Sequence, residues 1–298
     1  MAWPPDPDPD RAFTPTLTLH DGVVDYCADE YLESLWARQA RCAQYPGKTY
    51  PGLADSAGAA VRGRPAVIEW IDEVCAEFHQ TAAIRHAIVE IYDRFVLSHT
   101  AHLPGRLLQP YACAALLLGA DYYNCCCNTI PIHELYEATN STDSCSVPHI
   151  QAKERELLDF LEFRLHTVSC FDFIQIYTLV LKEAAETRPP ALVFTYPRSE
   201  AAAAAAAAAT GAPAKKPPWL GKYTEWTEYY VQALDRNEIE AFPLAAYLRA
   251  PPSFQAAWVC YHANLGFDAR PVWPDWLARL TRYTEADIRA LRFAGEWG

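Results

Sequence analysis

The sequence lacks long apolar segments, a phosphate-binding glycine loop and any excess of basic residues. No apolar run reaches 18 residues, so a membrane-spanning helix is not expected. The start of the chain is acidic and proline-rich, without the charged first region and apolar centre of a signal peptide. The chain has only 25 Lys and Arg against 37 Asp and Glu, which gives a net charge of -12. Such a surface repels phosphate backbones and anionic lipids, so neither nucleic acid nor membrane is expected as a main partner.

The ten cysteines follow no disulfide framework. Several fall inside predicted helices, where they should be small buried apolar residues, so we expect a protein of a reducing compartment. The run Cys125-Cys126-Cys127, with His133 and Cys145 nearby, could be read as a zinc site. Three adjacent cysteines cannot readily all point at one ion, so an irregular thiol-rich loop is the favoured interpretation. The nine histidines are scattered and none pairs with an obvious nucleophile, so we predict no metal, no cofactor and no catalytic residues.

The chain divides into several segments by composition. Its 298 residues, of which 51% are hydrophobic, suffice for one large domain or two of about 100–150 residues. Residues 1–20, rich in proline and aspartate, are predicted to be a disordered leader. Residues 21–55 are expected to hold an N-terminal helix and a link. Two helical halves should follow, at 56–167 and 168–298, with an alanine- and proline-rich insertion at about 199–218 in the second.

Apolar residues recur with helical spacing along both halves. Two stretches, Tyr111–Ala120 and Ser253–Leu265, carry almost no charge, so each should be the central helix of its half. Two sets of about five helices, each around one apolar helix, indicate an internal duplication. The helices expected are at about 23–42, 64–78, 81–95, 111–120, 132–138, 146–165, 171–185, 223–234, 253–265, 273–280 and 284–293.

Local signals mark where some of these helices begin. Thr81 is a candidate N-cap for the helix at 81–95, and Ser146 for the helix that begins beside it. Thr284 and Asp287 have the spacing of a capping box.

Five motifs occur in an order and spacing that resemble a cyclin. They are Arg64 to Val74, Asp93-Arg94-Phe95, Leu108-Gln109 through Leu118, Glu154, and Phe163-Arg-Leu165. In the second half, Trp273-Pro274 to Thr284 resembles a motif of the second cyclin fold. The likeness covers about residues 23–297, apart from the alanine insertion, and is closest in pattern to mitotic-type or viral cyclins.

The resemblance implies an all-α fold with two tandem five-helix cyclin boxes and an N-terminal helix. It implies a non-catalytic subunit that binds and activates a cyclin-dependent protein kinase, helps to recruit substrates and regulates the cell cycle from the nucleus and cytoplasm. Activation would follow if the active kinase conformation were bound better than the inactive one. Two alternatives remain open: a cyclin-fold scaffold or transcription-associated adaptor without activation, and a general transcription factor of the same fold. The last would need a basic DNA-facing surface, which an acidic chain does not favour.

The resemblance also implies a kinase-binding surface, in which the family uses one lysine and one glutamate to grip the backbone beside the kinase C helix. Glu154 matches the glutamate, but Asp121 stands where the lysine is expected, and a carboxylate only accepts hydrogen bonds. Either the partner kinase supplies a basic residue there, or the chain has lost activation and keeps the scaffold. The residues expected on this surface are Tyr31, Asp121, Tyr122, Glu154, Leu158, Phe163 and Leu165.

A second implied site is a shallow groove for substrate or inhibitor peptides of the R-x-L type. Its expected residues are Arg64, Val67, Trp70, Glu73 and Gln109. The family segment M-R-A-I-L reads Gly63-Arg-Pro-Ala-Val67 here, which removes several methylene groups worth about 0.8 kcal/mol each. We therefore expect R-x-L docking to be weak. Arg64 is further implied to form a buried ion pair with Asp93 that orients the first two helices.

Overall fold

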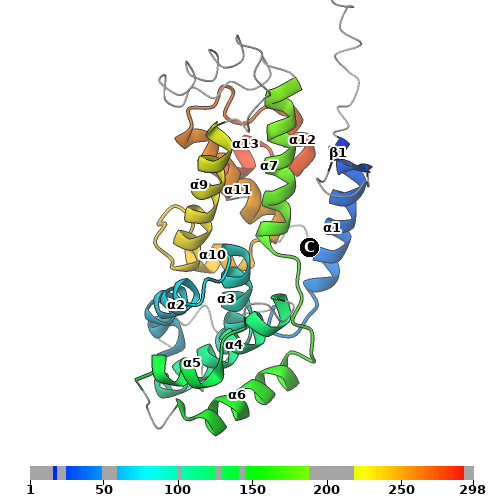
Figure 1. Cartoon of the computed structure of the whole chain (residues 1–298). Helices are drawn as coiled ribbons and strands as arrows, with labels where there is room; N and C mark the ends of the chain where they lie inside the picture. Colours follow the sequence, from blue (N-terminus) through cyan, green and yellow to red (C-terminus); the bar gives the residue numbers. More distant parts are fainter. Residues whose placement is uncertain are drawn as a thin grey trace, which may run out of the picture.

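The computed structural model describes residues 16–18, 25–48, 59–99, 103–124, 129–140, 145–187 and 218–291. Over these ranges the chain is helical, apart from two three-residue strands, and the predicted all-α class is confirmed. The helices lie in two groups, one holding α2 to α6 and the other α7 to α13 (Figure 1). Their bounds are α1 Ala28–Cys42, α2 Ala59–Glu77, α3 Ala82–Val96, α4 Leu108–Tyr123, α5 Ile132–Ala138, α6 Val147–Phe160, α7 Cys170–Thr187, α9 Pro218–Asp235, α10 Leu244–Arg249, α11 Pro252–Gly266, α12 Asp275–Thr281 and α13 Glu285–Arg289, with 3-10 turns at Leu97–His99 and Gly105–Leu107.

Each group of helices surrounds its own apolar core. In the first, α4 is buried at every position from Pro110 to Ala120 and packs against α3 and α6. In the second, α11 is buried over most of its length and packs against α7 and α9. Both central helices are those whose lack of charge predicted a buried position. A helix without a polar face has no side that water solvates well, so it is covered on all sides.

The N-terminal helix α1 packs on the second core and not on the first. Leu32 and Leu35 are each 1% exposed and belong to the same cluster as Phe173 and Tyr177 of α7. Figure 1 shows α1 running beside α7. Helix α1 therefore ties the start of the chain to its second half.

Several helix boundaries differ from the sequence prediction. Helix α1 begins at Ala28, because Asp25–Cys27 (β2) pairs antiparallel with Thr16–Thr18 (β1), so the leader predicted to be disordered has a strand at 16–18. The rest of that leader and the alanine insertion, up to residue 217, lie outside the described residues. Helix α2 begins at Ala59, before the predicted start at about residue 64, because Ala60 is fully buried in the first core and extends the helix.

The predicted caps hold in two of three cases. Thr81 caps α3 by accepting from the amide of Ile84 at 3.3 Å, and Thr284 forms a full capping box with Asp287 on α13. Ser146 stands at the N-cap of α6 but its side chain makes no capping hydrogen bond. Pro148 occupies the second position of that helix and has no N–H to offer.

Candidate functional site

The residues expected to bind a kinase come from the C-terminal end of α4, from α6 and from the turn that follows α6. Asp121 and Tyr122 are exposed on the last turn of α4, and Tyr122 keeps half of its surface free. Glu154 is partly buried on α6, and Leu158 is likewise partly covered and packs against the first core. Leu165 is only 8% exposed and lies within that core, so its place on the binding surface was wrongly predicted.

Asp121 and Glu154 form a pair of like charges across α4 and α6. Partial burial raises the pKa of Glu154, and the negative charge of Asp121 raises it further. Burial also raises the pKa of Asp121. A lysine at position 121 would instead lower the pKa of Glu154. The two carboxylates therefore favour the binding of a positively charged group at this part of the surface.

Ring and hydrogen-bond contacts connect the end of α4 to α1. The rings of Tyr122 and Tyr123 lie 6.5 and 6.2 Å from the imidazole of His166, which in turn hydrogen-bonds Arg38 of α1. Tyr31 lies seven residues before Arg38, two turns along the same side of α1, and is 36% exposed. The segment after α6, the end of α4 and α1 thus meet at His166.

The turn after α6 holds an aromatic ring out toward solvent. Glu162 and Phe163 both adopt left-handed backbone conformations, with φ of 51° and 59°. Each non-glycine residue in this left-handed conformation destabilises the fold by roughly 1–2 kcal/mol. The amide of Phe163 bonds the carbonyl of Leu158 at 3.0 Å and closes the turn. Its ring is left 70% exposed, an arrangement that stabilises no core and is typical of a contact surface.

Large apolar side chains are rarely exposed elsewhere in the described part of the chain. Five are exposed there, and three of them lie on α1, on the end of α4 and on the turn after α6: Tyr31, Tyr122 and Phe163. The other two are Tyr229 and Leu265. We call the surface formed by Tyr31, Asp121, Tyr122, Glu154 and Phe163 the aromatic–acidic face. Exposed aromatic rings beside a few charges are the composition of protein-binding sites.

The residues expected in a peptide groove are less uniform. Val67, Trp70 and Gln109 are partly buried, and Glu73 is exposed. Val67 and Trp70 pack against the first core. Arg64 has no exposed surface, so it cannot line a groove, and that assignment was wrong. The reason is that Arg64 lies on the side of α2 that faces Asp93 and the backbone carbonyl of Asp235.

Arg64 instead joins Asp93 in a buried ion pair. Its Nε donates to Oδ1 of Asp93 at 2.8 Å and its Nη2 to Oδ2 at 2.6 Å, so the contact is bidentate. The third nitrogen, Nη1, donates to the backbone carbonyl of Asp235, at the end of α9. Burial alone would lower the pKa of Arg64, but the charge of Asp93 raises it above its usual value.

Asp235 is the centre of a larger charge network between the two halves. Its carboxylate accepts from Arg85 at 3.0 Å, from His86 at 3.1 Å and from the hydroxyl of Tyr247 at 2.7 Å. Burial would raise the pKa of Asp235, but the positive charges of His86 and Arg85 lower it to about 2. Asp72 of α2 extends the network by accepting from Arg85 and from Arg236.

Sequence reasoning missed this network, although a signal for it existed. Arg85 and His86 interrupt the apolar side of α3, and a charge on a buried helix side needs a partner. The partner, Asp235, is about 150 residues away in the sequence. No local spacing could have identified it.

The described residues contain no group of three or more metal-ligating side chains. Cys125–Cys127 lie outside them, while His133 is exposed and Cys145 is buried. Among the same residues, no helix is both long and apolar enough to cross a membrane.

Comparison with known families gives one match to this part of the chain. The family model described as the cyclin N-terminal domain matches residues 31–166. The match begins at Tyr31 and ends at His166, so it contains the whole aromatic–acidic face. It covers α2 to α6, most of α1 and the buried pair of Arg64 and Asp93.

Proposed function

Because the chain belongs to the cyclin family, whose members are regulatory and non-catalytic, we propose that it binds a cyclin-dependent protein kinase through the aromatic–acidic face and activates it. The observation that carries the proposal is that Tyr31, Tyr122 and Phe163 are exposed on α1, on the end of α4 and on the turn after α6, three segments that meet at His166. The second half would serve as a second cyclin-like box. A role in the cell cycle, in the nucleus and cytoplasm, belongs to the same proposal.

Activation would work by a shift of population. A kinase that is 1% active becomes 99% active only if the cyclin binds the active form about 10⁴-fold better, or by about 5.5 kcal/mol. Buried aromatic anchors at protein interfaces contribute about 2 kcal/mol or more each. Tyr122 and Phe163 are still 50% and 70% exposed, and burial of their rings adds to that difference only where they contact the active form and not the inactive one.

The two carboxylates of the face determine which kinase can bind. Asp121 and Glu154 both accept hydrogen bonds, so neither can donate to the carbonyl groups that flank a kinase C helix. A kinase that presents an arginine or lysine there would relieve the repulsion that raises the pKa of Glu154. We therefore propose a partner with a basic residue beside its C helix.

Co-expression with candidate cyclin-dependent kinases tests the proposal. Wild-type chain should co-purify with one of them and raise its activity on a histone-type substrate. Binding without a gain of activity would favour the alternative of a scaffold or adaptor. Failure to bind any such kinase would contradict the proposal.

The variant Asp121→Lys tests the charge of the face. It should weaken binding of the natural kinase by about tenfold or more, because the new lysine would repel the basic residue proposed beside the kinase C helix. Glu137→Lys, on exposed α5, makes the same change of charge away from the face and should have little effect. Unchanged or tighter binding by Asp121→Lys would show that no basic residue of the kinase meets this position.

A further inference from the structure

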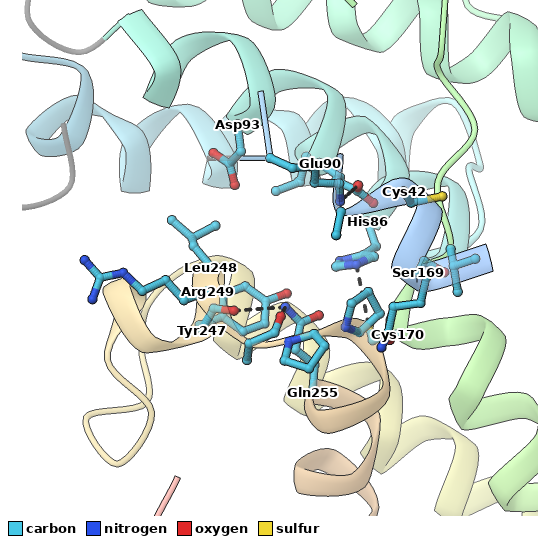
Figure 2. Close-up of a pocket in the computed structure, with 18 of the residues that line it drawn as sticks. Cys42, His86, Glu90, Asp93, Ser169, Cys170, Tyr247, Leu248, Arg249 and Gln255 are labelled. Atoms are coloured by element: carbon cyan, nitrogen blue, oxygen red, sulfur yellow. Dashed lines mark hydrogen bonds and ion pairs between the residues drawn. The ribbon is translucent and has the colours of Figure 1, made fainter. Parts of the chain in front are cut away.

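A cavity of about 340 Å³ lies where α1, α3, α10 and α11 meet the first turn of α7. Figure 2 shows His86 and Glu90 on one side of it and Tyr247 and Gln255 on another. Ala43 and Arg249, which also line it, are exposed, so the cavity reaches the molecular surface. It lies between the two halves, apart from the aromatic–acidic face.

Three side chains in this cavity are arranged as a nucleophile, a base and an orienting acid. The Sγ atom of Cys170 lies 3.5 Å from Nε2 of His86. The other ring nitrogen of His86, Nδ1, lies 3.1 Å from both carboxylate oxygens of Asp235. Because Nδ1–H donates to Asp235, Nε2 faces the sulfur and can hold the proton that the thiol gives up. All three residues line the cavity.

We propose that Cys170 is a modification site, a thiol activated by His86 and Asp235 and oxidised to a sulfenic acid by a small hydroperoxide that enters the cavity. Cys170 is the first residue of α7, and Asp172 caps the same turn. Cys170 is only 1% exposed, but it lines the cavity and contacts His86, whereas a purely structural cysteine is enclosed by apolar groups.

His86 contacts groups that favour its protonated form. Arg64, Arg85 and Arg236 are linked in one network with Asp72, Asp93, Asp235 and the more exposed Glu238, so a protonated His86 leaves this network without excess charge. Burial lowers the pKa of His86, but negative charge on Cys170 and on Asp235 raises it well above its usual value. The imidazole of His86 lies 3.5 Å from the sulfur of Cys170, so the two groups can share one proton.

The reaction balances with hydrogen peroxide as the only co-reactant. The Sγ proton passes to Nε2 of His86 as the sulfur attacks one peroxide oxygen. A sulfur–oxygen bond forms and the oxygen–oxygen bond breaks. The leaving hydroxide takes the proton from His86 and departs as water. Sulfur loses two electrons and the peroxide gains them, so the products are Cys170 sulfenic acid and water.

The same cavity contains a matched control. Cys42 of α1 also lines it and is also buried, but no histidine is recorded as its partner among the described contacts. A reagent that enters the cavity meets both thiols. Only Cys170 contacts His86, and Cys42 is the more exposed of the two, at 8% against 1%. Faster labelling of Cys170 would therefore report activation and not access.

The test is to treat the full chain with hydrogen peroxide and dimedone, which traps sulfenic acids, and to follow each cysteine by mass spectrometry. Cys170 should be labelled at least about tenfold faster than Cys42. His86→Gln should slow Cys170 at least about tenfold and leave Cys42 unchanged. Equal rates for the two cysteines in the wild-type protein would overturn the proposal. So would an unaltered Cys170 rate in a folded His86→Gln variant. If that variant does not fold, the wild-type comparison decides.

Discussion

Replacing Asp235 by asparagine tests whether one buried charge holds the two halves of the chain together. Asparagine keeps the shape of the side chain and can still accept from Tyr247, so the change removes mainly the negative charge. Arg85 and His86 then lose the carboxylate that both contact. Uncompensated charge in a buried site is costly, because water cannot replace the missing partner.

The size of the effect follows from the pKa of Asp235. Its folded value of about 2 lies below the ordinary value of 3.8, and this gap corresponds to roughly 2 kcal/mol of stability at neutral pH. The substitution also leaves Arg85 and His86 without their carboxylate partner, which adds to this loss of stability. We therefore expect Asp235→Asn to lower the free energy of unfolding by about 2–4 kcal/mol. Urea unfolding at pH 7, followed by tryptophan fluorescence, measures it.

The pH dependence has a definite sign. A carboxylate whose folded pKa is lowered stabilises the protein above its unfolded pKa, and that stability is lost as pH falls through the folded pKa. The part of the difference between wild type and Asp235→Asn that comes from the carboxylate itself should therefore be constant from pH 7 to pH 5. It should shrink as pH falls from about 4 toward 2.

Asp268→Asn is the matched control. Asp268 also pairs with an arginine, Arg270, but the two side chains are 61% and 74% exposed. Exposed pairs contribute about 0–1 kcal/mol, so this variant should be close to wild type. If Asp235→Asn were no less stable than Asp268→Asn, the network would not stabilise the junction and our reasoning about it would be wrong.

Two further predictions concern packing and docking. Gly119→Ala should cost about 1–3 kcal/mol in thermal or urea unfolding, because a Cβ there would come within 2.3 Å of Ile88. Gly221→Ala, with open space around its Cβ on α9, should instead gain up to about 1 kcal/mol, and equal effects would contradict the packing argument. Trp70→Ala should reduce phosphorylation of R-x-L substrates by the kinase complex while sparing substrates without the motif. An equal fall for both kinds would show that no such groove is used.

The sequence alone was sufficient for what depends on neighbours along the chain. The period of apolar residues located most helices, and the absence of charge identified α4 and α11 as the two central ones. Thr81 and Thr284 were recognisable as caps because a cap acts within three residues of itself. Helix α10 was missed, since six residues are too few to show a period.

Only the tertiary structure decided which of these residues are available to a partner. Phe163 and Leu165 stand two positions apart in one motif, yet a left-handed turn exposes the first while the core encloses the second. Arg64 was predicted to line the peptide groove, but it is fully buried and donates to the carbonyl of Asp235 at the end of α9. The contacts of Asp235 with Arg64, Arg85 and His86 span between 149 and 171 residues. Periodicity and capping are set by residues a few positions apart, whereas burial and charge pairing depend on which distant segments the fold brings together.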